Sequence, residues 1–298
     1  MASAAVAAGE ADDLSGAKWI GGMDFVDPLI GTEGSGSQYG GMMPYTGVPF
    51  GSFQMVPMTR LNRVGQLSFN SADDTLIGFI LTRQPAIWMG DWGEVRIPIE
   101  PAKIEHARYT PYLGQVTAGG STFEYTATAH AAWLRGDLKN MRLLDGYCSN
   151  RDDENLGRPL PNFKGWRCVK RVKDGMQIGV SLISLEQAWR NLDAEIGGKS
   201  FDEIVAETRS EWEKYFGRIE IDAPEDVKTI FYTGLYHTLL YPRQIDELGR
   251  YYSAFDDKIH DGTMYNCYSL WDTYRAEHPW LTLIAPERVD GMMQWQER

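Results

Sequence analysis

Two segments of the sequence place tryptophan beside aspartate, a combination that can bind a sugar. An indole ring can cover the apolar face of a pyranose while a carboxylate accepts hydrogen bonds from its hydroxyl groups. The candidate sugar-binding residues lie in segments 84–93 and 269–280 and are Trp88, Asp91, Trp92, Trp271, Asp272 and Arg275. An alternative for the first segment is a core tryptophan next to a turn aspartate. For the second, it is a helix-capping aspartate with a buried tryptophan.

The second segment is predicted to form a short helix from about 270 to 277. Trp271 and Arg275 are four residues apart, so on a helix they share one face. Asp272 is then expected to accept two sugar hydroxyl groups, with the indole and the guanidinium close by. A third segment, 31–44, is rich in glycine. Its backbone could approach a ligand closely because glycine has no side chain, and a flexible connector explains the same composition.

The other chemical motifs in the chain are incomplete. Segment 197–200 resembles the end of a phosphate-binding loop, but Asp193 stands where that pattern requires glycine. The five histidines have no paired metal-ligand spacing, so each is interpreted as a structural or surface residue. The three cysteines form no C-x-x-C pair and are predicted to be buried or partly buried thiols.

The composition is acidic and aromatic. The 298 residues carry a formal net charge of -12, and 12% of them are aromatic, including 10 tryptophans. The negative charge argues against nucleic-acid binding and against a polybasic membrane anchor. The sequence contains no run of 18 apolar residues, so no membrane span is predicted. It contains no recognisable secretory signal, so the chain is expected either to lack an export signal or to have lost one.

The elements that must position these residues change character along the chain. Residues 1–22 are predicted to be a disordered leader. From 23 to about 120, short apolar runs separated by glycine and proline are typical of an antiparallel β-sandwich. Further strands are predicted at 123–129 and 178–183, with a long loop at 145–175.

A helical pattern follows the last predicted strand. Ser200 and Glu203 form a capping box, and apolar residues of one helical face continue from there until Gly217. A second helix is predicted from about 224 to 241, and another from Pro286 onward. A sheet-rich first part followed by a helical second part indicates an α+β, two-domain arrangement.

Several motifs, in this order, resemble the family 92 glycoside hydrolases, which are largely α-mannosidases. The motifs that carry the resemblance are 26–32, 48–51, 84–93, 191–195, Trp212, 217–219, 231–240 and 269–288. The last two are the most specific. The resemblance covers about residues 24–298.

This resemblance implies an N-terminal antiparallel β-sandwich at 23–198, then linker helices and the start of an (α/α)6 helical barrel at 199–298. It also implies a calcium-dependent, inverting exo-hydrolase whose partner is a mannose-containing N-glycan or mannan. In such a mechanism one carboxylic acid protonates the leaving oxygen while a second carboxylate activates water. The sandwich-side wall of the sugar site would contain Trp88, Asp91 and Trp92, and the barrel-side wall Trp271, Asp272 and Arg275.

The sequence departs from the family in length. Family members are much longer, so the acid, the base and most calcium ligands are expected beyond Arg298, and this chain alone is predicted to be inactive. An alternative is a non-catalytic carbohydrate-binding or degenerate sandwich protein. Apolar helix residues such as Ile230, Leu235 and Leu239 are expected to lack partners at the barrel edge and to promote self-association.

Overall fold

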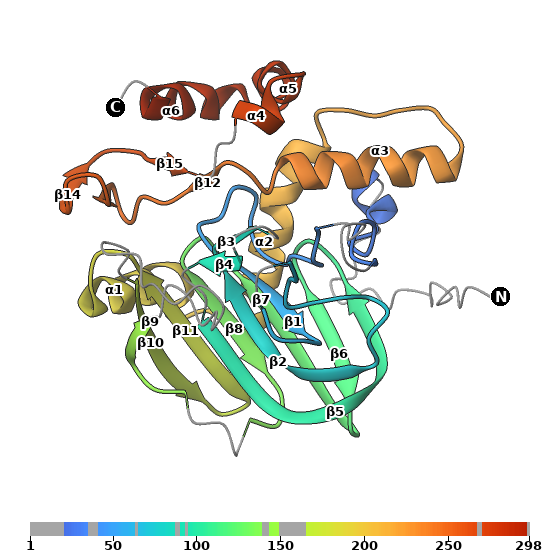
Figure 1. The fold of residues 1–298 in the computed structure, drawn as a ribbon, viewed down its shortest axis with the longest axis vertical. Helices are drawn as coiled ribbons and strands as arrows, with labels where there is room; N and C mark the ends of the chain where they lie inside the picture. The colour runs from blue at the N-terminus through green and yellow to red at the C-terminus, as the bar shows by residue number, and fades with distance from the viewer. Residues whose placement is uncertain are drawn as a thin grey trace.

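A large antiparallel sheet and a group of helices make up the protein (Figure 1). The computed structural model describes residues 21–34, 41–62, 65–86, 90–92, 95–138, 143–148, 165–266 and 270–296. In that part the strand order of the sheet is β1-β2-β5-β6-β7-β8-β11-β10-β9. The strands are β1 (Gln54–Met58), β2 (Thr75–Thr82), β5 (Val95–Tyr109), β6 (Gly114–Ala118), β7 (Ser121–Ala127), β8 (Ala131–Arg135), β9 (Gly146–Cys148), β10 (Gly165–Val172) and β11 (Gly175–Ser181).

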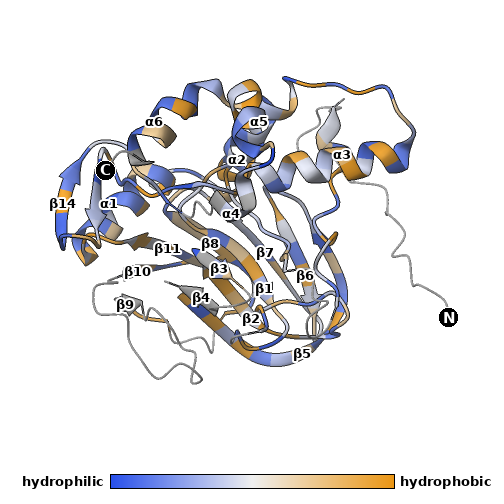
Figure 2. Ribbon diagram, turned by 45° about the horizontal axis from the view of Figure 1, so that its top comes forward, coloured by the Kyte–Doolittle hydropathy of each residue, from blue (hydrophilic) through white to orange (hydrophobic). Residues whose placement is uncertain are grey.

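The sheet folds over on itself because the long strand β5 belongs to both of its halves. The first part of β5, 95–103, pairs with β2, and the second part, 104–109, pairs with β6. One hydrophobic cluster contains Met55 and Leu81 from the first half together with Phe123 and Ile178 from the second. Figure 2 shows hydrophobic residues along β2 and β8. The two halves therefore face each other across one core, and a single continuous sheet supplies both layers of the predicted sandwich.

The loop predicted at 145–175 is wrong in part, because β9 and β10 both lie entirely within it. Strand β10 pairs with β11 from Trp166 opposite Ser181 to Val172 opposite Gly175. In β10 only Gly165 and Cys168 are buried, and the other residues, several of them charged, are partly or fully exposed. The sequence therefore lacks the apolar alternation that would have predicted a strand. The buried thiol of Cys168 confirms that part of the cysteine prediction.

Helix α1 (Leu185–Ile196) packs on β10 and β11 and was not predicted as a helix. Ser184 caps its N-terminus, where the hydroxyl accepts a hydrogen bond from the Gln187 amide. Gln187 and Asn191 are buried on the packed face and bond each other at 2.8 Å. These two amides interrupt the apolar stripe, so the 3.6-residue pattern is weak in the sequence.

Helix α2 (Phe201–Phe216) confirms the prediction made from its capping box. The Ser200 hydroxyl accepts from the Glu203 amide while the Glu203 carboxylate accepts from the Ser200 amide, and Gly217 follows the last turn. Helix α3 (Glu225–Thr238) also forms, but it ends three residues before the predicted limit at Tyr241.

The segment after α3 contains two small antiparallel pairs and three helices. Strand β12 (Arg243–Gln244) pairs with β15 (Tyr265–Asn266), and β13 (Arg250–Ser253) pairs with β14 (Lys258–Asp261). The helices are α4 (Leu270–Thr273), α5 (Glu277–Ile284) and α6 (Pro286–Gln296). The helix predicted near 270–277 begins at Leu270 as expected but is shorter, because α4 ends at Thr273 and a turn separates it from α5. Helix α6 begins at the predicted Pro286.

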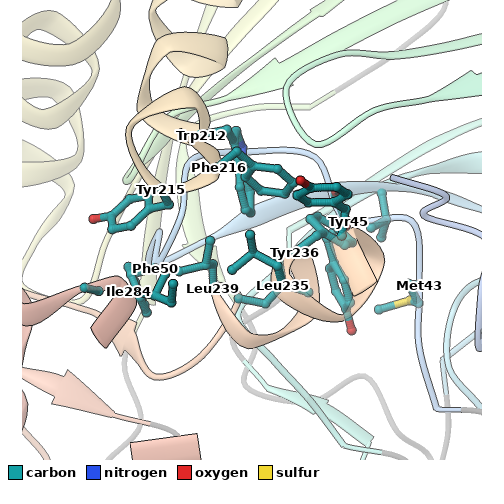
Figure 3. Close-up of a cluster of buried hydrophobic side chains, with 14 of the residues drawn as sticks. Met43, Tyr45, Phe50, Trp212, Tyr215, Phe216, Leu235, Tyr236, Leu239 and Ile284 are labelled. Carbon is teal, nitrogen blue, oxygen red and sulfur yellow. The ribbon is translucent and has the colours of Figure 1, made fainter. Parts of the chain in front are cut away.

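A mixed aromatic and aliphatic core joins the helices to the sheet (Figure 3). Trp212 of α2 is fully buried there between Phe216 and Tyr236, and its indole N–H donates to the Gly47 carbonyl at 2.6 Å. Leu235 and Leu239 also lie in this core, so the expectation that they lack partners is wrong. Ile230 is 68% exposed, as expected for that residue.

The predictions of a leader and of no membrane span can be compared with the described residues. Most of the predicted leader at 1–22 lies outside the described residues, and Gly22 begins the short 3-10 helix η1 (Gly22–Phe25), which packs near α3. None of the helices in the described ranges combines the length and the apolar character that a membrane crossing requires.

Candidate functional site

Two of the sandwich-side candidates, Asp91 and Trp92, lie on a hairpin that continues from β2 and leads into β5. Its strands are β3 (Gln84–Ala86) and β4 (Gly90–Trp92), with Gln84 opposite Trp92 and Pro85 opposite Asp91. The backbones of Asp91 and Trp92 therefore belong to β4, while their side chains lie outside the described structure. Trp88 also lies outside the described residues. Figure 1 places this hairpin at the edge of the sheet that faces the helices.

A buried arginine holds the base of this hairpin. The Arg243 guanidinium is fully buried and donates to the Thr82 carbonyl at 2.8 Å, at the end of β2, and to the Ser52 carbonyl at 3.4 Å. It also lies over the Tyr241 ring, 4.9 Å from the centroid. Sequence reasoning missed this residue, because its acceptors lie about 160 and 190 positions away along the chain.

The ends of the glycine-rich segment are also held in place. The Met42 amide donates to the Gly31 carbonyl at 3.1 Å, and the Asn70 side chain donates to the Gly34 carbonyl at 2.9 Å. Gly31 has a φ of 82°, a conformation that favours glycine. Residues 35–40 lie outside the described structure, so the choice between a ligand-approaching loop and a connector stays open for them.

The helix-side candidates lie in and just after α4. Trp271 is 85% exposed, and Asp272 belongs to the same helix with its side chain outside the described structure. Arg275 lies in the turn after α4, where its Nε donates to the Tyr274 hydroxyl at 3.0 Å. The predicted shared helical face of Trp271 and Arg275 is therefore wrong, because the helix ends between them.

Contacts from α5 support the α4 segment. The Thr273 hydroxyl and the His278 Nε2 lie 2.9 Å apart, which joins α4 to the first turn of α5. The Trp280 indole donates to the Thr238 hydroxyl at 3.2 Å, which joins α5 to α3. The structure thus places five of the six candidates on two separate elements, with Asp91 and Trp92 on the β3–β4 hairpin and Trp271, Asp272 and Arg275 on the α4 segment.

A histidine and a glutamate far apart in the sequence form a pair between the sheet and α1, with side chains that are 8% and 20% exposed. His130 Nδ1 lies 2.8 Å from Glu195 Oε1, and the His130 amide donates to Glu195 Oε2 at 2.8 Å. The Thr128 hydroxyl also donates to Oε2. The two residues are 65 positions apart, so no local spacing could reveal the pair. Interpreting His130 as structural agrees with its burial.

The pair shifts the pKa of both groups. Burial by itself lowers the pKa of His130, but the charge and hydrogen bond of Glu195, with the charges of Glu247 and Asp246, outweigh it and raise the pKa above 6.5. Burial by itself raises the pKa of Glu195, but the charge and hydrogen bonds of His130 and the hydrogen bond of Thr128 lower it below 4.5. The ionised pair is therefore favoured in the folded state.

The contribution of this pair to the free energy of unfolding is predicted to be largest at mildly acidic pH. The contribution of His130 is complete below pH 6.5 and is lost as pH rises through its raised pKa, and that of Glu195 is complete above pH 4.5 and is lost as pH falls through its lowered pKa. The free energy of unfolding of the native chain, minus that of a His130→Gln variant, should therefore be largest between pH 4.5 and 6.5. Urea titrations across pH 3 to 9 measure this difference, and a constant difference would contradict the prediction.

Comparisons with known proteins follow the same order along the chain. Residues 25–140 match the glycosyl hydrolase family 92 N-terminal domain, and residues 187–296 match the glycosyl hydrolase family 92 catalytic domain. Together the two matches cover most of the chain. A search of curated protein sequences gives no significant match.

Solved structures share the fold. A family GH92 inverting mannosidase from Bacteroides thetaiotaomicron matches with a TM-score of 0.80 and 25% identity, over 94% of this chain and 48% of that one. A family GH92 α-mannosidase from the same organism, solved in complex with mannoimidazole, matches with a TM-score of 0.73 and 20% identity, over 93% of this chain and 48% of that one. The chain thus spans about half the length of these enzymes. From the two domain matches, the chain belongs to glycosyl hydrolase family 92.

Proposed function

We propose that the chain forms part of the sugar site of an inverting, exo-acting α-mannosidase that acts on the α-linked mannose of N-glycans or mannans. One observation carries the proposal. The fold matches an inverting mannosidase at 25% identity over 94% of this chain. In this proposal α3 to α6 begin an (α/α)6 barrel, and the general acid and base come from sequence beyond Arg298.

The proposed roles follow the two elements described above. Asp91 and Trp92 of β4, together with Trp88, line the sandwich side of the sugar in this proposal, and Trp271, Asp272 and Arg275 line the helical side. The exposure of Trp271, at 85%, supports its role because an indole that is not used in the core remains available to a ligand. Arg275 would act from the turn after α4, not from the helical face predicted for it.

Calcium belongs to the proposal through the resemblance to the family. Calcium is bound by several oxygen ligands, mostly carboxylates and carbonyls. The described ranges contain no group of three or more histidine, cysteine, aspartate or glutamate side chains placed to hold a metal ion. The described side chains therefore supply no carboxylate cluster for calcium, and the proposed reaction includes no step through it.

Removing the Asp272 carboxylate should weaken mannoside binding. A hydrogen bond to a charged group contributes about 1.5–3 kcal/mol, so Asp272→Ala is expected to weaken the binding of methyl α-mannoside by roughly 10- to 100-fold. Isothermal titration of the chain with this sugar gives the affinity. Asp222→Ala, at an exposed aspartate between α2 and α3, is the matched control and should leave the affinity unchanged. If the native chain and the Asp272→Ala variant bind the sugar with equal affinity, Asp272 is not part of the sugar site.

A turnover assay tests the remaining part of the proposal. The chain alone should bind methyl α-mannoside but release no mannose from a chromogenic α-mannoside, with calcium or with a chelator present. Release that a chelator abolishes would overturn the placement of the acid and base beyond Arg298. Absence of binding would contradict the proposed sugar site itself.

A further inference from the structure

A cavity of about 330 Å³ opens between the sheet and the helices, apart from the β3–β4 hairpin and α4. Its walls come from the segment Val48–Gly51, the turn at Thr128–His130, and residues of α1, α2, β12 and α6. All of these residues belong to the described structure. The volume lies at the lower end of the range of about 300–1,000 Å³ that small-molecule sites occupy.

The buried imidazole in the cavity wall has one unused nitrogen. Glu195 holds His130 Nδ1, whereas His130 Nε2 is buried and has no hydrogen-bond partner among the described residues. His130 is only 6% exposed. A buried polar atom without a partner is unfavourable by about 1–3 kcal/mol, so a hydroxyl group bonded to Nε2 would relieve this cost. Because Nε2 is buried in the free structure, the wall at His130 has to open slightly for a hydroxyl group to reach it.

The charges in the wall favour an uncharged ligand. The acidic groups are Glu195, Glu207 and Glu211, and the basic groups are His130, Lys199 and Arg288. Lys199 pairs with Glu207 at 2.7 Å, and the charge of Glu195 is opposed by His130. Because equal numbers of groups of each sign face the cavity, neither an anion nor a cation meets an excess of opposite charge there.

The remaining wall is mixed, with the polar side chains of Thr128 and Gln244 beside apolar residues. Val48, Pro49 and Ala129 line it, and the Arg288 guanidinium lies over the Phe50 ring, 5.3 Å from the centroid. Hydrogen bonds fix Arg288, whose Nε donates to the Tyr215 hydroxyl at 3.1 Å. Apolar surface next to fixed charged donors and acceptors suits a pyranose, which has an apolar face and a rim of hydroxyl groups.

We propose that this cavity is a second carbohydrate site, which binds one neutral sugar unit through His130, Glu207 and Arg288 and lies outside the site at Trp271 and Asp272. The choice of mannose as the sugar rests on the proposed function. The existence of the cavity site does not, because its argument uses only residues of the cavity wall.

The test uses methyl α-mannoside as the probe and NMR spectroscopy of the chain labelled with ¹⁵N. We expect the His130 ring nitrogens and the amides of 128–130 to shift on titration, in the native chain and equally in Trp271→Ala. In the double variant Glu207→Ala, Glu211→Ala, the apparent affinity obtained from these shifts should fall about tenfold or more. Glu207 is 54% exposed and Glu211 39%, so these changes should leave the fold intact.

Glu213→Ala is the matched control, because Glu213 lies on the same helix in an ion pair with Arg209 and does not line the cavity. It should leave the titration unchanged. The proposal is overturned if the signals of 128–130 do not respond to the sugar, or if they respond to inorganic phosphate or calcium ions instead. If Trp271→Ala abolishes every response, the cavity site fails while the proposed function stands. If only the cavity responds, the cavity site stands and the site at Trp271 fails.

Discussion

Replacing Trp212 with alanine is expected to lower the free energy of unfolding by about 5 kcal/mol, because a buried tryptophan truncation costs about 3–5 kcal/mol and the orphaned Gly47 carbonyl adds about 1–3 kcal/mol. Trp212 is fully buried and connects α2 to the sheet and to α3 (Figure 3). Since the same cluster contains Tyr215, Phe216 and Tyr236, the cavity left behind cannot be filled by a neighbouring exposed residue.

Urea unfolding measures this effect, and the midpoint should fall without a change in slope if the unfolding stays two-state. Trp271→Ala makes the same chemical change at an indole that is 85% exposed. A surface substitution of this kind is expected to change stability by less than about 0.5 kcal/mol. Similar losses in the two variants would show that Trp212 does not act as the central residue of this core.

Replacing Arg243 with methionine is expected to lower the free energy of unfolding by about 3 kcal/mol, because hydrogen bonds from a charged donor contribute about 1.5–3 kcal/mol each. Methionine keeps most of the side-chain volume, so the loss comes chiefly from the acceptors that remain buried. The main acceptor is the Thr82 carbonyl, next to the start of β3. Amide hydrogen exchange in 84–92 should accelerate more than in β7 or β8, since the base of the hairpin loses its anchor.

Arg190→Met is the matched control for this change. Arg190 is 57% exposed and pairs with Glu186 one helical turn away on α1. Exposed pairs of this type contribute roughly 0.3–0.5 kcal/mol, so little stability should be lost. An Arg243→Met variant as stable as Arg190→Met would refute the anchoring role of Arg243, and uniform acceleration of exchange across the sheet would refute the link to the hairpin.

Local signals in the sequence predicted the elements that depend on local interactions. The capping box at Ser200, the apolar face that follows it and the stop at Gly217 all describe α2 correctly. Pro286 marks the start of α6 in the same way. Helix α1 was missed because its packed face includes Gln187 and Asn191, whose burial depends on partners such as Glu247 far along the chain. An amide pair of this kind cannot be recognised as core from periodicity.

For the candidate site too, local signals in the sequence found the residues, and tertiary contacts decided their positions. The tryptophan and aspartate segments at 84–93 and 269–280 were found from residue types and spacing, and the order of the motifs identified the family. The sequence could not place Arg275 beyond the end of α4, because the turn there is set by the contacts of α5 with Thr273 and Thr238.

By itself, the sequence determined the acidic character of the chain, the order of sheet and helices, the family and the six candidate sugar-binding residues. The tertiary structure decided that one continuous sheet bends at β5 to form both layers, that Arg243 anchors the hairpin, and that His130 meets Glu195 in the wall of a cavity. The physical reason is distance along the chain. Periodicity and capping report interactions within a few residues, whereas the His130–Glu195 pair and the Arg243–Thr82 contact join residues 65 and 161 positions apart, and only folding brings them together.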